Sequence, residues 1–132
     1  VPEAARPAIA TWLDLVKTWN ARIDLTAAKT DRDLVDLMVA DALLLSKEID
    51  PSKSVIDVGV GAGAPGFALA LLRPDLKLTL VEPLTKRVSF LRTAIVTIGR
   101  TDITLLRAKG ADMIGKPFET ASIPVYVPPP SE

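Results

Sequence analysis

The segment from Val55 to Gly66 constrains the fold of this chain more than any other part of it. It reads V-I-D-V-G-V-G-A-G-A-P-G: an apolar run that contains an acid, a loop of alternating glycines, and a proline that can open a helix. The last six residues match the dinucleotide-binding pattern G-x-G-x-x-G. Glycines let a backbone approach a ligand closely, and free N–H groups at a helix start attract the ligand's negative group. The segment therefore predicts a strand, a site for a nucleotide-like ligand and a helix, in that order.

Strand and helix patterns alternate from this segment onward. Apolar runs predict strands at residues 55–58, 78–82 and 103–106, separated by helices at 65–72 and 88–98. This alternation indicates an α/β fold with a buried parallel sheet, and right-handed crossovers place its strands in the order third, second, first.

The sequence before the glycine loop predicts helices. Apolar residues recur every three or four positions over residues 9–23, and Trp12 and Trp19 on this stripe are expected in the core. A second helix is predicted at residues 31–47, where Thr30 is the expected N-cap. Asp41 is the one acid on the apolar face of that helix, and we expect it to be a buried cap or a polar link to the glycine loop.

Composition narrows the chemistry. The chain has neither cysteine nor histidine, which excludes the common Ser/His and Cys/His nucleophile pairs and zinc sites built from those ligands, so no metal is expected. The 16 basic and 16 acidic residues cancel, so any binding to nucleic acid must come from a local patch. No signal peptide or membrane-spanning run is evident, and a cytoplasmic protein without a membrane partner is the default expectation.

Two acids and a proline favour one class of cofactor. Asp57 precedes the loop and is placed to accept a hydrogen bond from a ligand's ammonium group, while Glu82 ends the next strand, where an acid binds ribose hydroxyls. Pro65 removes an N–H where a pyrophosphate would need donors. S-adenosylmethionine fits these residues better than NAD, although a nicotinamide-dependent oxidoreductase and a merely structural turn remain the alternatives.

Four motifs in order carry a resemblance to a known family. They are W-N-x-x-I-D-L-T-A at residues 19–27, D-V-G-V-G-A-G-A-P-G at 57–66, R-P-D at 73–75 and K-R-V-S-F-L at 86–91. Over residues 12–111 the chain resembles ribosomal RNA small subunit methyltransferase G, the GidB family. The resemblance implies a class I S-adenosylmethionine-dependent methyltransferase fold, Rossmann-like, with N-terminal helices. It also implies methyl transfer to the N7 nitrogen of a guanosine in small-subunit ribosomal RNA.

The resemblance also assigns site residues. Gly59 and Ala64 fall on cofactor-loop positions of the family, alongside Gly61 of the glycine pattern, and Glu82 falls on the ribose acid. Ala108 and Lys109 fall where the family contacts the adenine end. Lys109 departs from the family, which usually has Glu there. The family's H-x-x-D-S-L motif reads M-V-A-D-A-L at residues 38–43.

Lys86 and Arg87 are the candidate RNA contacts, because they open the helix after the second strand and would meet phosphate there. A solvated helix face is the alternative for this pair. Solvated surface is the expectation for the other basic residues considered: Lys29, Arg32, Arg92 and Arg100.

The match to the family fails near Ser122, where the expected I-S-R-A strand gives way to a proline-rich tail. We therefore expect a C-terminally truncated family member with three parts: helices at 1–50, a cofactor-binding core at 51–118 and an atypical tail at 119–132. The first strand would then have a bare edge, which predicts self-association or pairing with a short strand at 125–127. An inactive remnant that at most binds cofactor, or an RNA-binding piece, remains an alternative to an active enzyme.

Overall fold

The strand before the glycine loop lies inside a four-stranded parallel sheet. The computed structural model describes residues 1–109 and 122–126, and within them the strand order is β3-β2-β1-β4. The bounds are β1 Ser54–Val58, β2 Lys77–Val81, β3 Thr104–Leu106 and β4 Ser122–Tyr126. β1 pairs in parallel with β2 from Ser54 opposite Lys77 to Val58 opposite Val81. The predicted order of the first three strands is therefore confirmed.

β4 pairs with the edge of β1 that faces away from β2, so the predicted pairing with a short strand of the tail is confirmed. β4 pairs in parallel with β1, from Ser122 opposite Ser54, and the register shifts between Ile56 and Asp57. Pro124 is compatible with this place because β4 is the outer strand of the described sheet, where a missing N–H is tolerated. The tail strand begins earlier than the predicted 125–127, and Val127 lies outside the described residues. The predicted self-association rested on an unpaired edge of β1. Because β4 pairs with that edge, self-association stays a prediction that this edge does not support.

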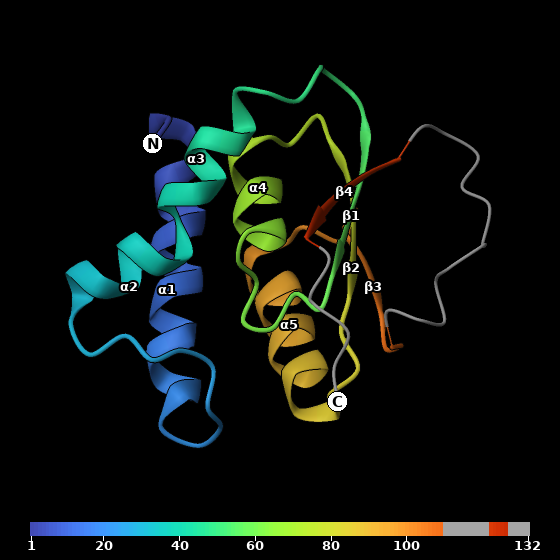
Figure 1. Ribbon diagram of the computed structural model, residues 1–132. Helices are drawn as coiled ribbons and strands as arrows, with labels where there is room; N and C mark the ends of the chain where they lie inside the picture. The colour runs from blue at the N-terminus through green and yellow to red at the C-terminus, as the bar shows by residue number, and fades with distance from the viewer. Residues whose placement is uncertain (110–121, 127–132) are drawn as a thin grey trace.

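The helices form two layers on one side of the sheet (Figure 1). α4 and α5 lie next to the strands, and α1, α2 and α3 lie beyond them. The helix bounds are η1 Glu3–Ala5, α1 Arg6–Asn20, α2 Asp31–Met38, α3 Ala40–Ser46, α4 Gly66–Leu72 and α5 Thr85–Ile98. Every residue of α4 is buried, because this helix is sandwiched between the strands and the outer helices. One continuous apolar cluster runs from Ala5 to Ile103, so the helices within residues 1–50 pack against the rest of the described chain.

The N-terminal helix ends earlier than its apolar stripe suggests. α1 stops at Asn20, whose Oδ1 accepts hydrogen bonds from the backbone N–H groups of Leu25 (2.8 Å) and Thr26 (3.0 Å). This side chain therefore fixes a turn in the W-N-x-x-I-D-L-T-A segment. Ile23 packs against the core from that turn.

The single helix predicted at 31–47 is two helices. Thr30 is the N-cap as predicted, its hydroxyl accepting from the Asp33 N–H at 3.1 Å. The helix breaks at Val39, whose φ of −119° departs from helical values and whose side chain is buried. The break divides the expected apolar face: Leu34 and Met38 are buried, whereas Leu44 is 67% exposed.

Two arginines tie neighbouring helices together. Arg73, just after α4, forms a bidentate pair with Asp75 at 2.8 Å. It also donates to the backbone oxygens of Ser46, the last residue of α3, and of Ile49, which follows that helix. Arg100 is not solvated surface as predicted, since it pairs with Asp102 and donates to the Ala70 oxygen in α4. Backbone carbonyls at helix ends lack partners within the helix, and these guanidinium groups supply them.

Within the described part of the chain, none of the helices has the length and apolar character needed to cross a membrane. The same residues contain no cluster of three acids close enough to hold a metal ion.

Candidate functional site: the glycine loop and its two acids

The loop after β1 bends sharply over the end of the sheet. Gly59, Gly61 and Gly63 have φ values of 73°, 61° and 117°, a region that side-chain-bearing residues rarely adopt. The Gly59 N–H donates to the Val81 oxygen at 2.8 Å, which ties the loop to the carboxyl end of β2. The loop therefore spans the ends of two neighbouring strands, the place where open α/β sheets bind ligands.

Asp57 fastens the far end of the loop to α4. Its carboxylate is fully buried, and Oδ2 accepts a hydrogen bond from the Gly66 N–H at 2.8 Å. A Cβ at Gly66 would lie 2.6 Å from the Asp57 Cβ, so only glycine fits this approach. The other oxygen, Oδ1, is buried without a hydrogen-bond partner among the described residues.

Burial raises the pKa of Asp57 to about 7, with Glu82 adding a smaller rise and the Gly66 N–H opposing it. A cation placed beside Oδ1 would lower this pKa again, because it favours the charged carboxylate.

Glu82 holds the middle of the loop. It is 1% exposed, and its Oε1 accepts from the Gly61 N–H at 2.9 Å while Oε2 accepts from the Leu84 N–H at 2.8 Å. Each carboxylate oxygen retains a second lone pair, so both hydrogen bonds leave capacity for a ribose hydroxyl. The Glu82 backbone oxygen accepts from the Ala108 N–H at 3.2 Å, which brings the end of β3 to the same edge.

Trp12 braces the loop from the outer helix layer. Its Nε1 donates to the Ala62 oxygen at 3.0 Å, and its ring packs edge-on against Phe67 with centroids 5.7 Å apart. A Cβ at Gly63 would lie 2.8 Å from the Phe67 Cβ and 3.2 Å from Trp12 Nε1. The expectation of a core tryptophan is confirmed, but the periodicity of α1 contained no signal for this bond, since it joins residues 50 positions apart.

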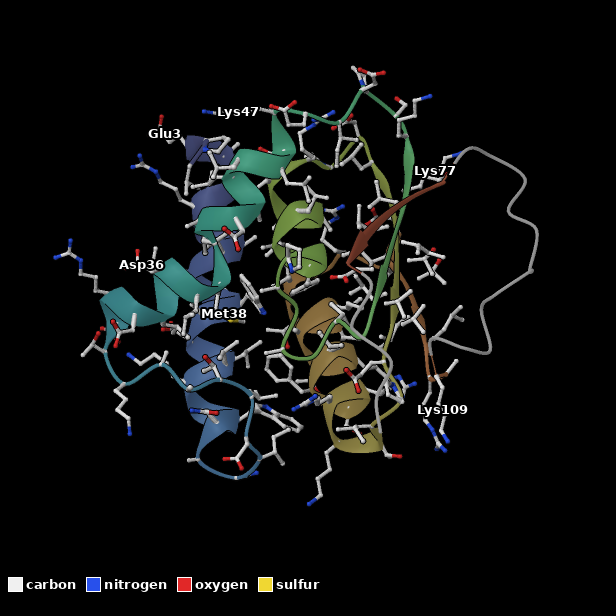
Figure 2. All side chains as sticks on the ribbon, in the orientation of Figure 1. Glu3, Asp36, Met38, Lys47, Lys77 and Lys109 are labelled. Atoms are coloured by element: carbon white, nitrogen blue, oxygen red, sulfur yellow. The ribbon has the colours of Figure 1, made fainter. Side chains whose placement is uncertain are left out.

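The structure brings most of the predicted cofactor residues to one edge of the sheet. Asp57, Gly59, Gly61, Ala64, Glu82 and Ala108 all lie at or beyond the carboxyl ends of β1, β2 and β3. Lys109 follows Ala108 and is exposed at the end of the β3 segment (Figure 2). The RNA candidates open α5, with Lys86 exposed and Arg87 half-buried.

A cavity of about 780 Å³ adjoins the loop on the side of the outer helices. Its lining includes Gly59, Ala64 and Pro65 of the loop and Leu37, Asp41 and Leu44 of α2 and α3. Asp41 is exposed, so the prediction of a buried cap is wrong. It instead shares this cavity with the loop.

Comparison with known proteins fixes the family. The family model described as GidB, rRNA small subunit methyltransferase G, matches residues 6–122. The chain belongs to the GidB family. Ribosomal RNA small subunit methyltransferase G of Clostridium beijerinckii is 39% identical over 103 residues, covering 76% of this chain and 43% of that protein. The protein of the same name from Neisseria gonorrhoeae is 31% identical over 109 residues, covering 83% of this chain and 53% of that protein.

The chain thus spans about half the length of the curated relatives it matches. Among solved structures, coclaurine N-methyltransferase bound to N-methylheliamine and SAH aligns with a TM-score of 0.52 at 18% identity. That alignment covers 74% of this chain and 29% of the other. At this identity the likeness shows the fold, which is the class I methyltransferase fold that the sequence predicted.

Trp12→Phe tests the brace between α1 and the loop. The substitution keeps an aromatic ring but leaves the buried Ala62 oxygen without its donor, which costs about 1–3 kcal/mol in the free energy of unfolding. Trp19→Phe is the matched control, because Trp19 also packs edge-on against a phenylalanine, Phe90. Urea denaturation should show a larger loss for Trp12→Phe. Equal losses would contradict a specific role for the indole N–H.

Asp57→Asn tests the pH dependence that follows from the raised pKa. The folded state binds a proton more tightly than the unfolded state, so the free energy of unfolding should fall as pH rises from about 4 to about 7, by at most about 1.4 kcal/mol per pH unit. Asp75 and Asp102 have lowered pKa values, so their stabilising effect is essentially complete by about pH 5 and does not change between the two pH values compared. Urea denaturation at pH 5 and pH 7 should show the fall in the parent chain and a much smaller one in Asp57→Asn. A parent chain equally stable at both pH values would refute this assignment.

Proposed function

We propose that this chain is the cofactor-binding part of an S-adenosylmethionine-dependent methyltransferase that acts on guanosine N7 in small-subunit ribosomal RNA. The observation that carries the proposal is the glycine loop held between two buried carboxylates, in a chain of the GidB family. The relatives' names supply the RNA substrate class, and the resemblance of the sequence supplies the position of methylation. Ribosomal RNA as substrate is consistent with a cytoplasmic location.

The residues present suit this cofactor. A Cβ at Gly61 would meet nothing within 4 Å, so the loop has an open side that a ligand can approach. Asp57 Oδ1 is a buried acceptor that lacks a partner in the described structure, as a site for an ammonium group requires. We propose that Gly59, Gly61 and Ala64 line the cofactor, that Glu82 accepts from ribose hydroxyls, and that Ala108 and Lys109 lie at the adenine.

Methylation of guanine N7 requires little chemical participation by protein side chains. When bound, S-adenosylmethionine supplies an activated sulfonium methyl group. Guanine N7 has a free lone pair and loses no proton on methylation, so the protein must mainly align two reactants and needs no general base. A chain without histidine or cysteine is compatible with this reaction, whereas cytosine C5 methylation needs a cysteine nucleophile.

Calorimetric titration and a transfer assay test the proposal. S-adenosylmethionine should bind and NAD should not, and Gly59→Asp should abolish binding because it places a charged side chain on the loop. Methyl transfer from labelled S-adenosylmethionine to small-subunit ribosomal RNA, followed by mapping of the modified base, then tests the activity. Binding of NAD alone would favour an oxidoreductase, and cofactor binding without transfer would identify a remnant.

Lys86 and Arg87 are proposed to contact RNA phosphates. Neither side chain forms an ion pair with another described residue, and basic groups in a first helical turn oppose the helix dipole, so their placement gives no evident gain in stability. The double variant Lys86→Ala/Arg87→Ala should weaken RNA binding uniformly across sequences. It should also reduce the slope of log affinity against log salt by about 1–2. Arg92→Ala, an exposed cation later in α5, is the control, and equal slopes in all proteins would contradict the assignment.

A further inference from the structure

Three residues of the outer helices form an apolar stripe with an acid in its middle. Leu37 in α2 and Asp41 and Leu44 in α3 line one cavity, on the two sides of the helix break at Val39. The sequence pattern predicted that this face is buried, but Leu37 is 55% exposed and Leu44 is 67% exposed. Large exposed apolar side chains grouped around a cavity are typical of a ligand site.

This stripe shares its cavity with the cofactor loop. Gly59 and Ala64 of the loop line the same space of about 780 Å³, within the range of about 300–1,000 Å³ typical of small-molecule sites. The cavity therefore connects the proposed cofactor site with α2 and α3. A second reactant held against α3 would lie beside the cofactor loop.

Asp41 is the polar group of this stripe. It makes no hydrogen bond or ion pair with another described residue, and an ionised carboxylate only accepts hydrogen bonds. The other acid lining the cavity, Glu48, lies beyond the end of α3 next to the cation Lys47, which lines the same cavity. Asp41 is thus a free acceptor pair flanked by apolar surface.

We propose that Asp41 accepts hydrogen bonds from the Watson–Crick edge of a guanine base bound in this cavity. This inference rests on the proposed function and adds the residue that selects the base. Guanine presents two neighbouring donors, N1–H and N2–H, which a carboxylate accepts in a bidentate manner. Adenine and cytosine offer only an exocyclic amine, and uracil only N3–H. Leu37 and Leu44 supply apolar contact for the ring, as in other sites that take bases out of a stack.

The orientation of the base follows from its own chemistry. N7 lies on the Hoogsteen edge of guanine, at roughly a right angle to the N1–H and N2–H donors of the Watson–Crick edge. When Asp41 accepts from N1 and N2, N7 therefore makes no contact with this carboxylate. The loop residues Gly59 and Ala64 line the same cavity. Reading the base at Asp41 thus leaves the atom to be methylated open to a reactant held at the loop.

Asp41→Asn tests this role without threatening the fold, because the side chain is exposed. Asp36→Asn, an exposed acid on α2 outside the cavity lining, is the matched control (Figure 2). GMP and IMP are titrated into each protein in the presence of S-adenosylhomocysteine, since IMP lacks only the 2-amino group. The parent chain and Asp36→Asn should prefer GMP by about tenfold, and Asp41→Asn should lose this preference. Affinity for S-adenosylhomocysteine should stay the same in all three.

The outcomes separate this inference from the proposed function. Equal binding of GMP and IMP by the parent chain, or an undiminished GMP preference in Asp41→Asn, overturns the role of Asp41 even if methyl transfer is observed. A loss of S-adenosylhomocysteine affinity in Asp41→Asn also overturns it, because the side chain would then serve the cofactor. A GMP preference that depends on Asp41, in a chain that transfers no methyl group, supports the base site and contradicts the proposed activity alone.

Discussion

The position of the loop depends on hydrogen bonds from its backbone to two buried carboxylates. Asp57 accepts from Gly66 at the start of α4, and Glu82 accepts from Gly61 in the middle of the loop. Asp57 lies within β1 and Glu82 comes directly after β2, so the parallel pairing of the two strands sets the distance between the two anchors. A loop held in this way is shaped before any ligand arrives, which reduces the ordering cost of binding.

Hydrogen bonds also connect the outer helices to the loop and to α4. Trp12 reaches the loop from α1, and Arg73 joins the end of α3 to the end of α4. These side chains donate to backbone carbonyls, so the bonds fix the path of the backbone and do not depend on which side chain the accepting residue carries. The N-terminal helices therefore contribute to the shape of the glycine loop, although its sequence motif lies outside them.

Local chemistry was sufficient to predict much of this fold. The glycine pattern predicted the strand, loop and helix; Thr30 predicted the start of α2; and Gly99, with a φ of 85°, ended α5 as expected. The predictions that differ from the structure all concern tertiary contacts. The break at Val39 and the ties made by Arg100 depend on partners distant in sequence, and the tail strand, predicted at 125–127, begins earlier, at Ser122. At the site, spacing placed the acids correctly at the sheet edge but gave no indication that Glu82 already binds two backbone N–H groups.

The bond between Trp12 and the loop also bears on how the chain folds. It closes 50 residues of chain, and both ends must be in place before it can form. Contacts of such long range are slow to form, because the entropy of loop closure is lost before the contact contributes any stability. The bond can therefore form only after β1 and the loop have been synthesised. The part of the molecule that is made first is thus fixed to the glycine loop only once a much later segment of the chain is present.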